Sequence, residues 1–158
     1  MCYGGLVTEA ATSLRGDVDV HLDRDTTPEG LVQAARHRNP EYLHQQRYLT
    51  HANGAQALAD VVLSTLDPEA TARRYEGLTG RKAHADGRGW AIDLLQVARL
   101  VFLSPPPSVA AFGFAVADLE RTARLLETAK FSLQRTGARV VVPAEEALGV
   151  AHHFFEKT

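Results

Sequence analysis

The chain of 158 residues is short of several features that mark particular classes of protein. It has one cysteine, Cys2, so no disulfide can form within the chain, as is usual in a reducing compartment. No apolar run approaches the length that spans a bilayer, and the first residues lack a basic segment followed by an apolar one. We therefore expect a cytoplasmic protein that does not bind membranes.

The chain also has no surplus of positive charge. Its 17 Lys and Arg are mixed with 19 Asp and Glu, for a net charge of −2, whereas nucleic-acid-binding domains carry basic patches. A glycine-rich phosphate loop after a strand and a Gly-x-Ser-x-Gly motif are both missing from the sequence. Nucleic acid is therefore not an expected partner, and two common classes of enzyme are excluded.

Residues 1–55 differ in pattern from the rest and are interpreted as an N-terminal extension. Polar and apolar residues alternate over 17–25, which predicts an edge strand. Thr27 followed by Pro28 predicts a helix start, and Pro40 predicts a second short helix. A helical cover, a remnant of an upstream module and a partly disordered arm are all compatible with this pattern.

Residues 56–158 show one order of elements twice, in modules of about 57–104 and 109–156. The first module reads as a strand over 58–65, a helix from Asp67 to about Gly80, and strands near 82–84, 90–93 and 98–103. The second reads as a strand over 111–116, a helix from Asp118, and strands near 131–134, 138–142 and 150–155. Each module is therefore predicted to be a βαβββ unit.

The two predicted helices also resemble each other in sequence. A shift of 51 residues aligns 67–76 with 118–127, and six of the ten positions are identical. Asp and Glu are common at helix starts for electrostatic reasons, but the shared Thr-Ala-Arg is not explained in that way. The pattern predicts an internal duplication.

Tandem βαβββ modules resemble the vicinal oxygen chelate superfamily, which includes glyoxalases, extradiol dioxygenases and bleomycin-resistance proteins. The resemblance covers about residues 48–155 and is carried by segments that include Leu58-Ala-Asp-Val-Val-Leu, Asp67-Pro-Glu-Ala-Thr-Ala-Arg-Arg-Tyr and Phe112-Gly-Phe-Ala-Val-Ala-Asp-Leu. It implies an α+β fold in which both modules form a half-open curved mixed sheet, preceded here by a partly helical extension. It also implies a homodimer, which would cover the exposed edges of the sheet.

In this superfamily a divalent metal, where present, is held by the first and last strands of each module. Alignment strand by strand places the four ligand positions on Asp60, Val101, Ala111 and His153. Val101 and Ala111 cannot coordinate a metal, so neither a metal nor another cofactor is expected. The alternative is a two-ligand site of Asp60 and His153, and a slip of one residue would place His152 inside instead.

Without a metal, the cup of the curved sheet is expected to be a largely apolar pocket. Strand alternation predicts that its walls consist of Asp60, Val62, Ser64, Trp90, Ile92, Val101, Leu103, Gly113, Ala115, Val141, His153 and Phe155. Trp90 is the only tryptophan and could stack on a planar ligand, or it could belong to the core or a dimer interface. A metal cluster of His37, His44 and His51 is not expected, because Pro40 interrupts the helix that such a cluster needs.

The preferred functional hypothesis is a metal-independent protein that binds a small organic molecule in the cup. An enzyme of the same superfamily is the alternative: a metal-assisted lyase, isomerase or dioxygenase, or a metal-free acid–base enzyme built on Asp60 and His153. A non-catalytic interaction scaffold is the third hypothesis. The identity of the ligand does not follow from the sequence.

Overall fold

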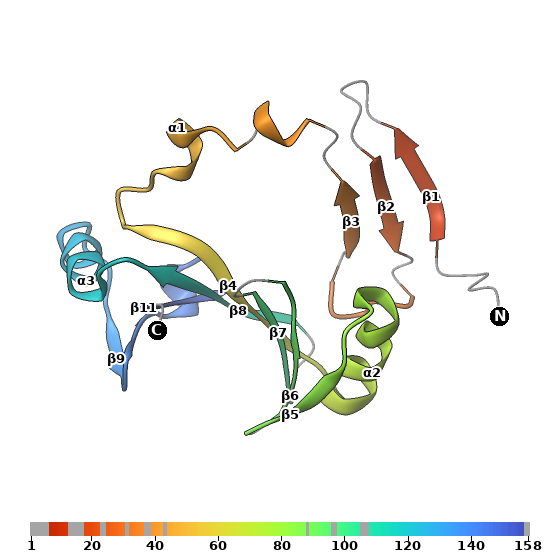
Figure 1. Ribbon diagram of the computed structural model, residues 1–158. Helices are drawn as coiled ribbons and strands as arrows, with labels where there is room; N and C mark the ends of the chain where they lie inside the picture. The colour runs from red at the N-terminus through yellow and green to blue at the C-terminus, as the bar shows by residue number, and fades with distance from the viewer. Residues whose placement is uncertain are drawn as a thin grey trace. The chain divides into compact units, whose positions relative to one another are not determined.

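The computed structural model describes residues 7–12, 18–22, 25–30, 32–36, 39–42, 44–87, 89–95, 98–104 and 108–156 (Figure 1). The chain forms two compact units, Met1–Leu49 and Thr50–Thr158, each with its own sheet. This boundary precedes the predicted one after residue 55. Cys2 and His37 lie outside the described residues. No helix in the described part of the chain is long and apolar enough to cross a membrane.

The first unit contains a three-stranded antiparallel sheet in the order β1-β2-β3. Its elements are β1 (Val7–Thr12), β2 (Val18–Leu22), β3 (Gln33–Arg36), a 3-10 turn (Pro40–Tyr42) and α1 (Gln46–Leu49). The strand predicted at the edge, β2, lies between the other two. The helix predicted after Thr27 is wrong, because this segment turns and then joins the ladder, where the Leu22 amide donates to the Val32 carbonyl at 3.0 Å.

The second unit is an eight-stranded mixed sheet in the order β5-β6-β7-β4-β8-β11-β10-β9 (Figure 1). The first module contains β4 (Ala55–Ser64), α2 (Pro68–Thr79), β5 (Ala83–Asp86), β6 (Gly89–Asp93) and β7 (Arg99–Leu103). The second contains β8 (Ser108–Val116), α3 (Leu119–Thr128), β9 (Gln134–Thr136), β10 (Arg139–Val142), a 3-10 turn (Ala144–Glu146) and β11 (Ala151–Glu156). The modules meet at the centre, where β4 and β8 pair antiparallel.

The two helices begin in the same way. The Asp67 carboxylate accepts the Ala70 amide at 2.9 Å, and the Asp118 carboxylate accepts the Arg121 amide at 2.8 Å. Each cap satisfies a backbone N–H that has no partner within the helix. The shared Thr-Ala pair faces inward in both helices, since Thr71–Ala72 and Thr122–Ala123 are buried.

Replacing Asp118 by alanine is expected to lower the free energy of unfolding by about 1 kcal/mol, because the Arg121 amide loses its acceptor. Urea unfolding at pH 7 measures the difference. Asp118→Ser is the matched control and is expected to retain most of the stability, since serine caps nearly as well. An equal loss in both variants would contradict the capping role.

The helices cover one face of the sheet, and the core lies beneath them. On α2, the Tyr75 ring packs against buried Phe102 with centroids 5.3 Å apart. Under α3, Leu126 packs in a buried cluster with Phe154. Because neighbouring side chains along a strand point to opposite faces, Val101 and His153 lie on the other side of the sheet, called the open face below.

Candidate functional site

The open face carries a row of four positions across the four central strands. Asp60 on β4 lies opposite Arg99 on β7 and Gly113 on β8, and Gly113 lies opposite His153 on β11. These are the first and last strands of each module. The superfamily resemblance points to the same four strands for a metal.

A buried carboxylate stands at the centre of this row. The Asp60 side chain is 6% exposed and accepts hydrogen bonds from Arg99 Nε at 3.3 Å and Arg139 at 3.2 Å. His153 Nε2 lies 3.2 Å from the same oxygen that Arg139 contacts. An ionised carboxylate can only accept hydrogen bonds, so Nε2 is the protonated nitrogen of His153 in this pair. Asp60, Arg99, Arg139 and His153 are called the Asp60 cluster below.

The cluster keeps Asp60 ionised. Burial alone would raise the pKa of the Asp60 carboxyl, because a charged group loses its hydration. The His153 hydrogen bond, the Arg99 charge and the guanidinium hydrogen bonds outweigh burial and lower the pKa to about 2. At neutral pH Asp60 is therefore an anion that orients its partners. Its pKa lies too far below neutral pH for an efficient general base.

Gly113 makes the space that the cluster needs. A Cβ at this position would collide with His153 Nε2, and would lie 2.7 Å from Asp60 Cβ and 2.9 Å from His153 Cδ2. The imidazole therefore reaches Asp60 across a strand that has no side chain at this point.

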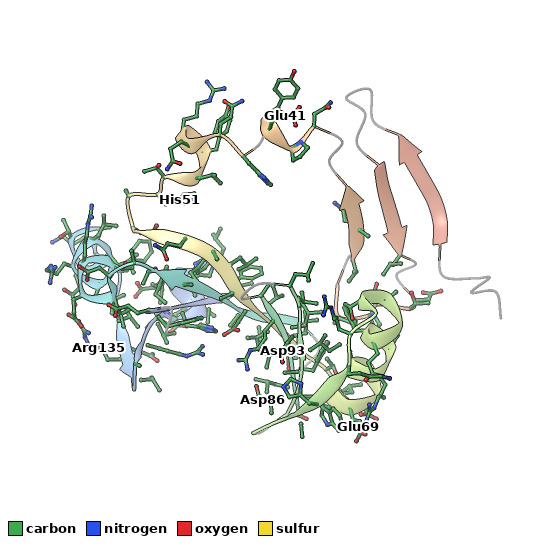
Figure 2. All side chains as sticks on the ribbon, in the orientation of Figure 1. Glu41, His51, Glu69, Asp86, Asp93 and Arg135 are labelled. Atoms are coloured by element: carbon green, nitrogen blue, oxygen red, sulfur yellow. The ribbon has the colours of Figure 1, made fainter. Side chains whose placement is uncertain are left out.

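The two arginines differ in their remaining contacts. Arg99 also donates to Asp86 on β5 at 3.1 Å; the position of Asp86 is marked in Figure 2. Arg139 places its guanidinium 4.5 Å from the centre of the Phe155 ring, and its side chain remains 39% exposed. Both guanidinium groups contact the Asp60 carboxylate, and Arg99 has Asp86 as a second carboxylate partner.

A groove of about 500 Å³ begins at Arg139 and Phe155. It is lined by Leu119, Glu120, Thr136, Ala138, Arg139, Phe155 and Glu156. Both glutamates are engaged elsewhere: Glu120 pairs with Arg135, and Glu156 accepts the Leu119 amide at 2.9 Å. The groove therefore combines an apolar wall with one partly exposed guanidinium, which suits an organic molecule with an oxygen acceptor, and with the Glu156 carboxylate, which keeps its charge.

Most of the predicted pocket residues lie on the open face. Pairing and alternation place there Asp60, Val62, Ser64, Val101, Leu103, Gly113, Ala115, Val141, His153 and Phe155. His153 rather than His152 faces Asp60.

Two predicted pocket residues, Trp90 and Ile92, are on the wrong face. Trp90 pairs with Phe102, whose ring packs on α2, and Arg73 of α2 lies 4.8 Å from the Trp90 ring. Ile92 is fully buried on the same side. In β6 it is Ala91 that shares the open face with Val101.

The predicted metal positions Val101 and Ala111 also need correction. Both lie opposite Val62, two residues along β4 from Asp60. The residues that lie opposite Asp60 are Arg99 and Gly113. A slip of two residues leaves every side chain on the same face, so hydrophobic alternation does not reveal it. Sequence reasoning missed Arg99 and Arg139, although each is a single charge at the start of an otherwise apolar strand.

The donor set does not fit a divalent cation. Only Asp60 and His153 in the row have ligand atoms, while Arg99 directs a cation at the carboxylate and Gly113 offers nothing. The described residues contain no group of three or more His, Cys, Asp or Glu side chains that could hold a metal.

No protein-family model and no curated protein matches the chain. Solved structures do match it. A methylmalonyl-CoA epimerase from Mycobacterium tuberculosis superposes with a TM-score of 0.59 at 14% identity, over 72% of this chain and 96% of that one. The chain has the vicinal oxygen chelate fold. A hypothetical protein from Bacillus halodurans C-125 (TM-score 0.52, 14% identity, 65% and 94% covered) and a second methylmalonyl-CoA epimerase (TM-score 0.51, 9% identity, 64% and 94% covered) share this vicinal oxygen chelate fold.

The α+β fold class predicted from the sequence is confirmed by these superpositions. At such low identity these superpositions establish the fold alone.

Proposed function

We propose that the vicinal oxygen chelate unit binds a small organic molecule on its open face without a metal, and that Arg139 holds a carboxylate of that molecule. The observation that carries the proposal is the position of Arg139, which shares the Asp60 carboxylate with Arg99 and keeps 39% of its side chain exposed at the mouth of a groove. A guanidinium binds a carboxylate with directed, charge-assisted hydrogen bonds. Phe155 and Leu119 supply apolar wall for the rest of the ligand.

The same geometry supports the proposal that no metal is needed. Asp60 is the only carboxylate in the row, and Arg99 and Arg139 already lie within hydrogen-bond distance of it. A metal cation placed beside Asp60 would therefore be repelled by both guanidinium charges. We propose that these guanidinium groups supply the positive charge that a metal supplies in other proteins with this fold.

Arg139→Gln is expected to abolish ligand binding by removing the cation at the groove. Thermal shift of the full chain, dialysed against a chelator, would be measured with succinate, benzoate and methylmalonyl-CoA; the last is included because two similar folds belong to proteins named for it. A carboxylate at about 100 times its Kd is expected to raise the Tm by several degrees in the wild type and not in Arg139→Gln.

Arg124→Gln, an exposed change on α3, is the matched control and is expected to keep the full shift. A shift that survives in Arg139→Gln would place the ligand elsewhere. A shift that requires added zinc or manganese would contradict metal independence.

The homodimer and the cytoplasmic location stay predictions. The sheet ends at β5 and β9, and no described strand pairs with their outer edges. Such edges are commonly covered by a partner, which is the physical support for a dimer.

A further inference from the structure

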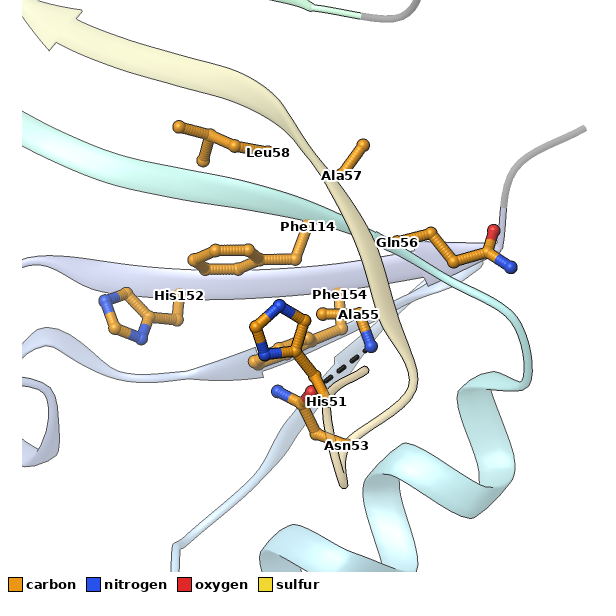
Figure 3. Close-up of a pocket in the computed structure, with 9 residues that line it drawn as sticks. All are labelled: His51, Asn53, Ala55, Gln56, Ala57, Leu58, Phe114, His152 and Phe154. Atoms are coloured by element: carbon orange, nitrogen blue, oxygen red, sulfur yellow. Dashed lines mark hydrogen bonds between the residues drawn. The ribbon is translucent and has the colours of Figure 1, made fainter. Parts of the chain in front are cut away.

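A second groove lies on the helix-covered face of the sheet, around the first half of β4 (Figure 3). Its volume is about 530 Å³, and it is lined by His51, Asn53, Ala55, Gln56, Ala57, Leu58, Phe114, His152 and Phe154. Phe114 directly follows Gly113, and His152 directly precedes His153. Because neighbouring side chains along a strand point to opposite faces, Phe114 and His152 point away from the Asp60 cluster. We propose that this groove is a separate binding site for a planar aromatic molecule that carries an anionic group.

Aromatic rings form one wall of this groove. Phe114 and Phe154 are stacked with centroids 5.4 Å apart, and His152 meets Phe114 edge-on at 5.5 Å. Phe154 is held in the buried cluster under α3, so this wall is fixed before a ligand arrives. Leu58 beside it is 47% exposed and adds apolar surface. A flat apolar ring can stack here at little ordering cost.

The polar atoms at the groove favour an anion. Asn53 accepts the Ala55 amide at 3.2 Å through Oδ1, which leaves its NH₂ group as a donor, and Figure 3 shows His51 beside it. His152 adds an imidazole, whereas the Gln56 carboxamide points away from the rings in Figure 3. None of the described residues that line the groove is Asp or Glu, so these donors face no competing carboxylate there. This combination of rings and donors suits an aromatic carboxylate.

The test uses 1-naphthoate and the ¹⁵N-labelled full-length chain, followed by amide NMR. Saturable shifts are expected at Ala57, Leu58, Phe114 and His152. Leu58→Asp, which brings a negative charge to the groove, is expected to raise the Kd at least tenfold. Leu148→Asp is the matched control at a fully exposed site with a positive φ of 57°, which aspartate tolerates, and is expected to leave the Kd unchanged.

Two further probes separate the parts of the proposal. Naphthalene-1-methanol lacks the charge and cyclohexanecarboxylate lacks the planar ring, and each is expected to bind at least several-fold more weakly than 1-naphthoate. Equal binding of all three would overturn the proposed ligand class. Shifts confined to Arg139 and Phe155, an unchanged Kd in Leu58→Asp, or no saturable shift would overturn the site itself.

Discussion

Replacing Gly113 by alanine is expected to lower the free energy of unfolding by about 3 kcal/mol. The new methyl group would collide with the His153 ring and lie 2.7 Å from Asp60 Cβ, in a place where the backbone is paired on both sides. Overpacking of a filled site costs about 1–3 kcal/mol, and displacing the imidazole also removes its hydrogen bond to a buried charge. Urea unfolding of both proteins at pH 7 gives the difference.

Gly77→Ala in α2 is the matched control and is expected to act in the opposite direction. Apart from its chain neighbours and the backbone of its own helix, no heavy atom of the described residues lies within 4 Å of a Cβ at Gly77, and alanine favours the helix by about 1 kcal/mol over glycine. A double-mutant cycle then isolates the cause. In a His153→Ala background the cost of Gly113→Ala is expected to fall by at least 1 kcal/mol. An unchanged cost would mean that the collision with His153 is not what destabilises the protein.

The helix starts of the second unit were predictable because their signals are local. Asp67 and Asp118 cap helices within three residues of themselves, and no distant contact is needed to read them. The same kind of local signal failed at Thr27 and Pro28, since turns also use these residues. There the pairing of Gln33–Arg36 with β2, a contact between distant segments, decided the structure.

For the site, the sequence could predict which face of the sheet a side chain lies on, but not which residues of neighbouring strands lie opposite one another. Asp60 and His153 were identified because the superfamily resemblance places ligand positions on their strands, and alternation left His152 as an alternative to His153. Arg99 was missed because a two-residue slip of β7 against β4 changes no face. Trp90 was misplaced because β6 is a short strand with apolar residues on both sides, so its own pattern does not choose a face.

Replacing Asp60 by asparagine is expected to lower the free energy of unfolding by about 2 kcal/mol at pH 7. The folded-state pKa of about 2 lies below the ordinary value of 3.8, so the native state binds fewer protons than the unfolded chain between these values. That difference corresponds to about 2 kcal/mol in favour of the folded state, and asparagine, which has no charge, loses it. The side chain is buried, so solvent screens little of this effect.

The pH dependence identifies ionisation as the source of this stability. The stabilisation by Asp60 is complete above the unfolded pKa and is lost as the pH falls toward 2, so the gap between wild type and Asp60→Asn is expected to be constant from pH 8 to 5 and to shrink from pH 4 downward. Asp93→Asn, at a carboxylate with 67% exposure on β6, is the matched control and should change stability by less than about 0.5 kcal/mol. A gap of the same size at pH 7 and pH 2.5 would instead assign the loss to packing. In that case the charge of Asp60 would not hold the positive groups around it, and it would not be what positions Arg139 at the groove.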